Sequence, residues 1–367
     1  MMTWAYAAIL AWSVAMPAPA TSVAPVPSVM PVPAVTPAVS PMPMPRPEQV
    51  MAVPPELRAQ LQQQVIAVGG SGKPRLERLV NFLFQKSGLG MEYAADATLT
   101  VEQAYRLRKG NCLTFTLLTV ALAHESGLEA YGQELDDVVA WGVRNDIIYR
   151  LNHVNAGVTI GRSHYTVDVM RDLVIARHPP EPISDQRLVA LYYGNRAVEL
   201  LADVSPAAAA PYMAMALQLA PRHASGWANA GVLQLLQGDR RAAERDYLKA
   251  LALDPTHVGA LFNLVTLYRS IGDDARSAIF ERRLEKAQTK DPYFQFLQAE
   301  DDEKRGDYAG AVQHYRRAIR LYDGDSRFYF GLAHAYRQLG EERHARRAMH
   351  RAAALSRSSA GGRNQGR

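Results

Sequence analysis

The sequence predicts an α+β domain followed by an all-α solenoid of helical hairpins, and three observations point to this two-part fold. Residues 56–180 carry a block of helical patterns followed by a block of extended, β-branched segments. Residues 188–356 carry only helical patterns separated by short polar breaks, and glycine recurs in those breaks every 34 residues. A chain of 367 residues, 48% of them hydrophobic, is long enough for two such domains.

The first 20 residues have features of an export signal. Residues 4–15 form an apolar stretch too short to span a bilayer, and the small-x-small sequence at 18–20 is suited to cleavage before Thr21. No Lys or Arg precedes the apolar stretch, so an uncleaved leader is the alternative. We expect a signal peptide at 1–20, a periplasmic or otherwise exported protein, and proximity to a membrane through this segment.

Both ends of the chain have biased compositions. Thirteen prolines lie between Pro17 and Pro55, which predicts that residues 21–55 form an extended, disordered tether. Residues 341–367 hold seven arginines against two glutamates and so account for the whole net charge of +5. No interleaved aromatic and basic pattern accompanies them, so we expect a disordered basic tail at 357–367 and no nucleic-acid partner.

The α+β domain is expected at 56–180. Helical spacing predicts helices over 56–68, 73–85 and 100–110, and the last begins with Thr100 in an N-cap pattern. A further apolar helix starts after the cysteine and ends at Ser126-Gly127. Alternating β-branched and aromatic residues then predict an antiparallel sheet, formed by the segments 129–141, 146–160 and 163–170.

Cys112 is the single cysteine, so the chain cannot form an internal disulfide. A thiol reacts as thiolate, and a helix N-terminus and a neighbouring imidazolium are two common ways to favour that form. Gly110 and Asn111 predict a tight entry into a helix directly before the sulfur, which places the positive end of the helix dipole there. Cys112 is therefore a candidate nucleophile.

His153 and Asp168 are the candidate partners of this cysteine. Alternation along 146–160 places His153 and Asn155 on one face of a strand, and Asp168 lies on one face of the next strand. A turn centred at Ile160-Gly161 would put His153 and Asp168 opposite one another, where the carboxylate holds the imidazole tautomer and stabilises the imidazolium. The predicted catalytic residues are thus Cys112, His153 and Asp168.

Other roles for these residues stay open. An isolated cysteine in an apolar helix is commonly a buried core residue. His164 is a rival base, but it lies only four residues before Asp168 on the same strand. A zinc site built from Cys112, His124 and His153 lacks a close pair of ligands. For an oxyanion, the backbone N–H of Cys112 is one donor, and the second is not assigned.

Gln103 is the sequence candidate for that second oxyanion donor, on the helix expected at 100–110. Nothing in the sequence indicates a metal or a cofactor.

The order and setting of these residues resemble those of the transglutaminase-like superfamily, a permuted relative of papain-like folds. The resemblance rests on Gly110-Asn111-Cys112 before an apolar helix, on His153 in a strand and on Val167-Asp168, and it covers about residues 75–175. It implies a thiol enzyme that hydrolyses a peptide or amide, or transfers the acyl group to an amine. Two departures, Val154-Asn155 after the histidine and Val169 after the aspartate, leave the substrate open.

The second half resembles the tetratricopeptide (TPR) repeat. One unit matches the repeat pattern at Trp227, Gly231, Tyr247, Ala250 and Pro255. Four repeats are expected to start near 227, 261, 295 and 329, with a degenerate one near 193. The breaks carry the recurrent glycines Gly238, Gly272, Gly306 and Gly340.

Two functions follow as expectations. The first is an exported transglutaminase-like thiol enzyme that acts on a peptide or protein substrate and binds a protein partner on the concave face of its repeats. The second is a non-enzymatic adaptor in which the repeats bind partners and the first domain is catalytically inactive. Fold resemblance by itself does not decide between them.

Overall fold

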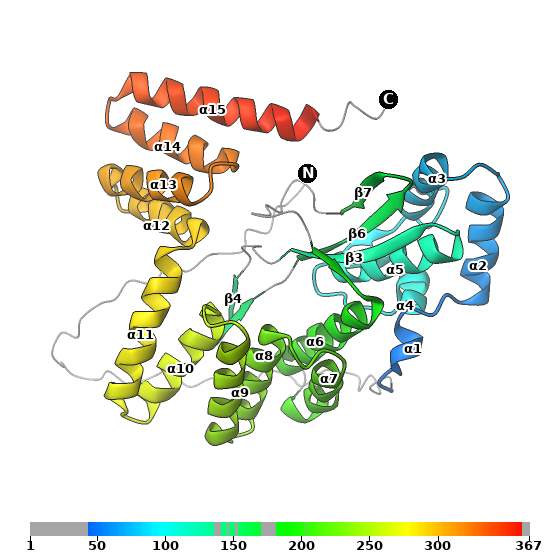
Figure 1. Ribbon diagram of the computed structural model, residues 1–367, viewed down its shortest axis with the longest axis horizontal. Coiled ribbons are helices and arrows are strands. Elements are labelled where there is room, and N and C mark those ends of the chain that lie inside the picture. The colour runs from blue at the N-terminus through cyan, green and yellow to red at the C-terminus, as the bar shows by residue number, and fades with distance from the viewer. Residues whose placement is uncertain are drawn as a thin grey trace, which may run out of the picture.

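The computed structural model describes residues 43–135, 141–144, 147–150, 153–169, 181–203 and 205–361. An α+β layer, with helices α2 to α5 beside the strands β3, β6 and β7, occupies one side of the molecule, and helices α6 to α15 follow one another in an arc away from it (Figure 1). The expected signal peptide, most of the expected tether and residues 362–367 lie outside the described part of the chain.

Residues 43–55 differ from the extended tether predicted for them. They contain helix α1 (Pro47–Val50) and lead into α2 (Pro55–Leu61), which continues as a π-helical turn, η1 (Gln62–Ile66). Val50 and Val53 are buried in the main apolar core, and the Tyr193 hydroxyl donates a hydrogen bond of 2.5 Å to the carbonyl of Pro45. The proline count suggested an extended segment, but burial of the apolar side chains between the prolines folds it onto the domain.

The predicted helices of the α+β domain are present: α3 (Lys73–Phe84), α4 (Val101–Leu107) and α5 (Cys112–Glu125). Thr100 caps α4, and Gly127 takes a left-handed φ of 69° just after the end of α5, as the Ser-Gly pair predicted. Every side chain of α5 from residue 113 to 123 is buried. This central helix is apolar all round because protein surrounds it on every side.

The main sheet is antiparallel and has the strand order β7-β6-β3-β8. Its strands are β3 (Glu129–Leu135), β6 (His153–Ile160), β7 (Ser163–Val167) and β8 (Glu181–Ile183). The alternate residues Val154, Ala156 and Val158 of β6 lie in the same core as α5. Two short pairings accompany the sheet: β1 (Glu92–Tyr93) lies parallel to β2 (Lys109–Gly110), and β4 (Trp141–Arg144) lies antiparallel to β5 (Ile147–Arg150).

These strands agree with the segments predicted from alternation. Within the expected segments, residues 136–140, 146, 151–152 and 170 lie outside the described residues. The sheet also gains β8, which follows the last strand that the sequence predicted.

The helical half forms five successive helix pairs between residues 185 and 361, in agreement with the predicted hairpin solenoid. The turns of the last four pairs hold the recurrent glycines, with φ of 85°, 72°, 79° and 75° in chain order. Glycine is needed there because other residues pay a steric cost in this left-handed conformation. The pairs are α6 (Asp185–Asp203) with α7 (Pro206–Leu219), α8 (Ala224–Leu236) with α9 (Arg240–Leu253), α10 (Val258–Ser270) with α11 (Asp274–Thr289), α12 (Pro292–Lys304) with α13 (Tyr308–Leu321), and α14 (Ser326–Gln338) with α15 (Glu342–Gly361).

Repeated tyrosines pack between the helices. Tyr247, Tyr268 and Tyr315 are fully or almost fully buried. A Cβ atom on Gly231 would come within 2.5 Å of the Tyr247 ring, so the glycine lets α8 and α9 approach closely. Tyr336 differs, because it is only partly buried and lines a surface groove.

The first repeat is not separate from the α+β domain. Leu188, Tyr192 and Tyr193 of α6 are buried in the same apolar core as α5 and the sheet. At the far end, α15 continues to Gly361, so residues 357–361 of the expected disordered tail are helical. Among the described residues, no helix is both long enough and apolar enough to cross a bilayer.

Candidate active site

Cys112 is the first residue of α5, and Asn111 is its N-cap. The Asn111 Oδ1 accepts a hydrogen bond of 3.0 Å from the backbone N–H of Thr114, and its Nδ2 donates one of 2.7 Å to the Thr98 Oγ1. The amides at the start of a helix have no partner inside the helix, so their positive ends face the residue that begins it. The thiol is half-buried at this helix start.

A loop over residues 94–99 holds this helix start in place. Ala97 accepts hydrogen bonds from the N–H of Asn111, at 3.0 Å, and from the Thr114 hydroxyl, at 2.9 Å. The N–H of Leu99 donates to the same hydroxyl at 2.8 Å. A Cβ on Gly110 would come within 2.4 Å of the Thr114 methyl, so only glycine fits at this entry.

The loop is also joined to the first repeat helix. The N–H of Thr98 donates a hydrogen bond of 3.3 Å to the Glu199 Oε1 of α6, and Arg196 pairs with the same carboxylate. Burial raises the pKa of Glu199, and its hydrogen bonds to Thr98 and its pairing with Arg196 offset part of that rise. A chain of contacts therefore runs from α6 through Thr98 to Asn111, the cap of the cysteine helix.

His153 and Asp168 meet on the sheet. The His153 Nε2 lies 2.8 Å from the Asp168 Oδ2, and Asn155 donates a hydrogen bond of 3.0 Å to the same oxygen. Both members of the pair are buried, since the side chains are 4% exposed for His153 and 6% for Asp168. A charged pair removed from water in this way interacts more strongly than one at the surface.

The register that makes this contact differs from the predicted one by two residues. Ile160 pairs with Ser163 and Ala156 with Val167, so the turn lies at Gly161-Arg162, and the same register puts Asp168 opposite Asn155. The prediction that Asp168 lies directly opposite His153 was wrong. The faces were nonetheless right, because a shift of two residues keeps every side chain on its own side of the sheet.

The ionisation of His153 reflects both its neighbours. Burial by itself lowers the pKa of the imidazole, but hydrogen bonds with Asp168 and with Cys112, together with the charges on both, outweigh it and raise the pKa to about 9. Since Nε2 is engaged by the carboxylate, Nδ1 is the ring nitrogen left for the thiol. The structure thus brings together all three residues that the sequence singled out.

The rival residues lie elsewhere. His164 is exposed, and its Nδ1 lies 3.3 Å from the Thr159 hydroxyl across the β6–β7 hairpin. His124 lies near the far end of α5, about 18 Å along the helix from Cys112. Its Nε2 bonds to the carbonyl of Ala130 at 2.7 Å. The zinc site from Cys112, His124 and His153 is therefore wrong on geometry.

Gln103 has a local structural role. Its Oε1 accepts a hydrogen bond of 3.0 Å from the N–H of Thr100, and its own N–H donates to the Thr100 hydroxyl, which makes a capping box for α4. Its side-chain oxygen is thus used in the helix cap. In the part of the chain that the structure describes, no cluster of three or more His, Cys, Asp or Glu side chains could hold a metal ion.

Tyr93 is a residue near the site that the sequence did not indicate. It pairs with Gly110 in the parallel β1–β2 ladder, two residues before Cys112. Burial, followed by the nearby charges of Cys112 and Asp168, raises the pKa of Tyr93 to about 12. Its hydroxyl therefore keeps its proton at neutral pH and can donate a hydrogen bond. A two-residue parallel pairing has no sequence signal, so only the fold could reveal this neighbour.

Comparisons with known proteins bear on the repeats. Residues 224–257 match the tetratricopeptide repeat family model. The chain is 34% identical over 142 residues to cellulose synthase operon protein C of Xanthomonas axonopodis pv. citri (strain 306). The aligned part is 36% of this chain and only 9% of that much longer protein. The chain therefore contains TPR-type repeats, and their match at 224–257 starts close to a repeat that the sequence predicted.

Two solved structures are also similar. MamA residues 41 to the end, from Desulfovibrio magneticus RS-1, is 17% identical, covers 46% of this chain and 96% of its own, and has a TM-score of 0.26. YrrB, described as a TPR protein with an unusual peptide-binding site, is 16% identical over 45% of this chain and 86% of its own, with a TM-score of 0.26. Likeness at this level carries no argument about function. The comparisons bring no support for the transglutaminase-like resemblance, which stays a proposal.

Proposed function

We propose that this protein is a transglutaminase-like thiol enzyme with Cys112, His153 and Asp168 as its catalytic residues, joined to a protein-interaction module of TPR repeats. The observation that carries the proposal is that buried His153 is hydrogen bonded to Asp168, and that interactions with Asp168 and with Cys112, the first residue of α5, raise its pKa against the lowering effect of burial. Nucleophile, base and orienting group in this mutual arrangement are what thiol catalysis needs.

The reaction begins with the thiolate–imidazolium pair. The Cys112 Sγ attacks the carbonyl carbon of a peptide or side-chain amide, and the carbonyl π electrons move to oxygen. His153 then gives its Nδ1 proton to the departing nitrogen, the C–N bond breaks, and an amine or ammonia leaves behind a thioester. Asp168 stays ionised throughout and holds the ring in the tautomer that presents Nδ1 to the sulfur.

The second half-reaction returns the enzyme to its starting state. His153, now neutral, removes a proton from water, whose oxygen attacks the thioester carbon, and the C–S bond breaks to give a carboxylic acid and the free thiolate. A primary amine in place of water gives a new amide instead. Water yields hydrolysis and an amine yields cross-linking, so the product identifies the acceptor.

The oxyanion that forms in both half-reactions needs two donors. The backbone N–H of Cys112 at the start of α5 is one of them. We assign the second to the Tyr93 hydroxyl, because this residue lies beside Gly110 in the ladder and is sensitive to the charge on Cys112. This places both donors on the side of the site formed by the β1–β2 pair.

Partner and compartment complete the proposal. The repeats bind a protein partner along their concave face, and the apolar segment at 4–15 directs export to the periplasm or beyond. An exported protein of this fold would not need a disulfide, because a large apolar core holds the fold together.

A second candidate is a non-enzymatic adaptor whose first domain is inactive. The family match favours it, since that match lies within the repeats. Under this reading the repeats carry the function. The buried His153–Asp168 pair would then only stabilise the sheet.

The rate of Cys112 alkylation by iodoacetamide from pH 4 to 10 separates the two candidates. For the enzyme, we expect substantial reaction at pH 6, where an ordinary thiol of pKa about 8.5 is almost fully protonated. His153→Ala should lower the rate at pH 6 by about tenfold or more, since the imidazolium that favours the thiolate is gone. His164→Ala is the matched control, because its imidazole lies at the far end of the hairpin, and it should leave the rate unchanged.

A thiol that reacts at pH 6 no faster in the wild type than in His153→Ala would support the adaptor. Cys112→Ala then serves as the reference for substrate screens with peptide and amide libraries. Its free energy of unfolding should change by only about 1 kcal/mol, because the thiol is half-buried and small. Any turnover that survives in this variant does not come from the proposed site.

A further inference from the structure

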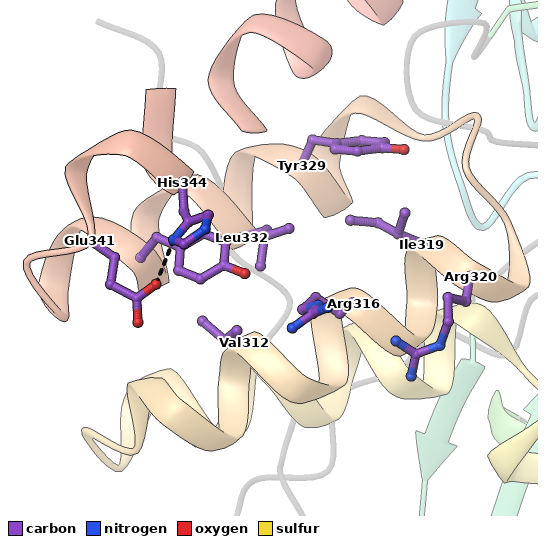
Figure 2. Close-up of a pocket in the computed structure, with 9 residues that line it drawn as sticks. Val312, Arg316, Ile319, Arg320, Tyr329, Leu332, Glu341 and His344 are labelled. Atoms are coloured by element: carbon purple, nitrogen blue, oxygen red, sulfur yellow. Dashed lines mark hydrogen bonds and ion pairs between the residues drawn. The ribbon is translucent and has the colours of Figure 1, made fainter. Parts of the chain in front are cut away.

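A surface groove lies at the end of the repeat stack. Helix α13 forms one wall, α14 lies beside it, and the start of α15 closes one end (Figure 2). The cavity has a volume of about 530 Å³, within the range of sites that hold a small molecule or a short peptide segment. Its lining residues are Val312, Arg316, Ile319, Arg320, Tyr329, Leu332, Tyr336, Glu341 and His344.

Two unpaired cations lie on one wall of the groove. Arg316 and Arg320 are one helical turn apart on α13, and both are exposed. Neither guanidinium has an ion pair or hydrogen bond within the described chain, whereas Arg327 on the neighbouring helix pairs with Asp325 at 3.1 Å. Free guanidinium groups beside a cavity are suited to bind carboxylates, often in a bidentate way.

Apolar and aromatic side chains make up the remainder of the lining. Ile319 lies between the two arginines in sequence, and Tyr329 extends from α14 beside the cavity (Figure 2). Tyr336 of the same helix also lines the cavity. The tyrosines are only partly buried, although the Tyr336 ring packs against His344 at 5.0 Å between centroids and the Arg351 guanidinium lies 6.0 Å from the Tyr329 ring. Tyrosine is enriched at protein interfaces because it buries a large apolar ring and still offers a hydroxyl.

The far end of the groove has the opposite charge. The Glu341 Oε2 lies 2.7 Å from the His344 Nδ1, and this pair closes the end near the turn before α15 (Figure 2). A ligand with charge along its whole length would meet this carboxylate. The arrangement instead favours a ligand with negative charge at one end and an apolar group beside it.

We propose that the groove binds an acidic peptide segment, whose carboxylates pair with Arg316 and Arg320 while an aliphatic or aromatic side chain of the same segment packs against Ile319, Tyr329 and Tyr336. The site is formed by α13, α14 and the turn into α15 at the end of the repeat stack. It goes beyond the proposed function and does not depend on catalysis.

The test measures binding of two fluorescein-labelled peptides to the full chain by fluorescence anisotropy. The acidic probe is DDEEIFSS, which carries its negative charge at one end and an apolar pair beside it, and the control probe NNQQIFSS keeps the apolar pair without the charges. We expect the acidic probe to bind at least about tenfold more tightly, with affinity that falls as salt is raised. The double variant Arg316→Glu/Arg320→Glu should weaken its binding by about tenfold or more.

A matched double variant controls for non-specific electrostatic attraction of the acidic probe to the arginine-rich C-terminal helices. Arg317→Glu/Arg337→Glu makes the same change in net charge at exposed arginines that do not line the groove, and it should alter the affinity less than about threefold. Circular dichroism spectra of both variants must match the wild type. An equal loss of affinity for the acidic probe in the two double variants would overturn the proposal. It would show that the overall positive charge of these C-terminal helices attracts the probe, and not the groove.

Two further results would also overturn it. One is tighter binding of the neutral probe than of the acidic one. The other is a clear preference for oligothymidylate or for phosphatidylglycerol vesicles that is lost in Arg316→Glu/Arg320→Glu but kept in the matched variant, since it would assign the two arginines to phosphate groups instead.

Discussion

The two halves of the molecule are held together in different ways. In the repeats, each helix packs mainly against the next one along the chain, and the same glycine turn recurs in each of the last four pairs. In the α+β half, the three reactive residues come from α5, β6 and the end of β7, which are distant in sequence. Local contacts therefore build the repeats, whereas contacts of long sequence separation build the site.

Helix α6 belongs to both halves. It is the first helix of the first pair, yet its apolar residues Leu188 and Tyr192 lie in the core of the α+β domain, and its Glu199 accepts a hydrogen bond from Thr98 in the loop beside the cysteine helix. Glu134 of β3 and Arg187 of α6 add an ion pair of 2.8 Å at this junction. The comparison thus predicts that damage deep in the repeats spares the site, while damage to α6 reaches it.

The largest effect should come from Tyr247→Ala. This side chain is completely buried between α8 and α9, so its loss leaves a large cavity and should lower the free energy of unfolding by about 3–5 kcal/mol. Urea unfolding followed by circular dichroism measures it, and hydrogen exchange should show lost protection in the central repeats. Leu248→Ala, an exposed position on the same helix, is the control, with an expected change within about 0.5 kcal/mol.

Cys112 alkylation at pH 6 should not change in Tyr247→Ala under conditions where the protein stays folded. A loss of alkylation together with the loss of protection in the repeats would mean that both halves unfold as one unit. The contrast between local and long-range construction would then fail.

The next effect is on the pH dependence of stability. The folded-state pKa of His153, about 9, lies above its ordinary value of about 6.5. The stabilisation from its imidazolium is therefore complete below about pH 6.5 and is lost as the pH rises through 9, and it should amount to about 1–3 kcal/mol. The free energy of unfolding of the wild type minus that of His153→Gln, measured from pH 6 to 10, isolates it.

If the free energy of unfolding of the wild type minus that of His153→Gln stays constant across this pH range, His153 is not held as an imidazolium. A difference that instead grows with pH would mean that the folded state favours the neutral ring. Either result would contradict the ionisation derived from the Asp168 and Cys112 contacts.

The smallest effect should come from Glu199→Ala at the junction. Removal of this carboxylate leaves the N–H of Thr98 without its acceptor and should cost about 1 kcal/mol of stability. Because Thr98 holds Asn111, the alkylation rate of Cys112 at pH 6 should also fall, by about threefold. Glu199→Gln keeps an acceptor oxygen and should restore the alkylation rate.

The alkylation rate distinguishes a positioning role of Glu199 from a merely structural one. If Glu199→Ala lowers the melting temperature but leaves the alkylation rate at pH 6 as in the wild type, α6 supports the fold without aligning the nucleophile. The link between the repeats and the site would then be one of stability alone.

Much of the site could be read from the sequence because its signals are local. Gly110 and Asn111 predict the helix start at Cys112, and strand alternation predicts which faces carry His153 and Asp168. The register was off by two residues, but the faces were right because side chains alternate with a period of two. Residues 43–55 were mistaken for a tether because proline content says nothing about what buries the valines between the prolines.

The sequence by itself determined the helical pairs, their glycine turns and the candidate triad, since each depends on residues close together or on a repeated spacing. Only the tertiary structure decided that Tyr93 lies beside Gly110, that Glu199 bonds to Thr98 across 101 residues, and that Arg316 and Arg320 line a groove. The physical reason is that burial and charge pairing depend on which surfaces contact one another in the folded chain. Such tertiary contacts produce no periodic pattern of residues in the sequence.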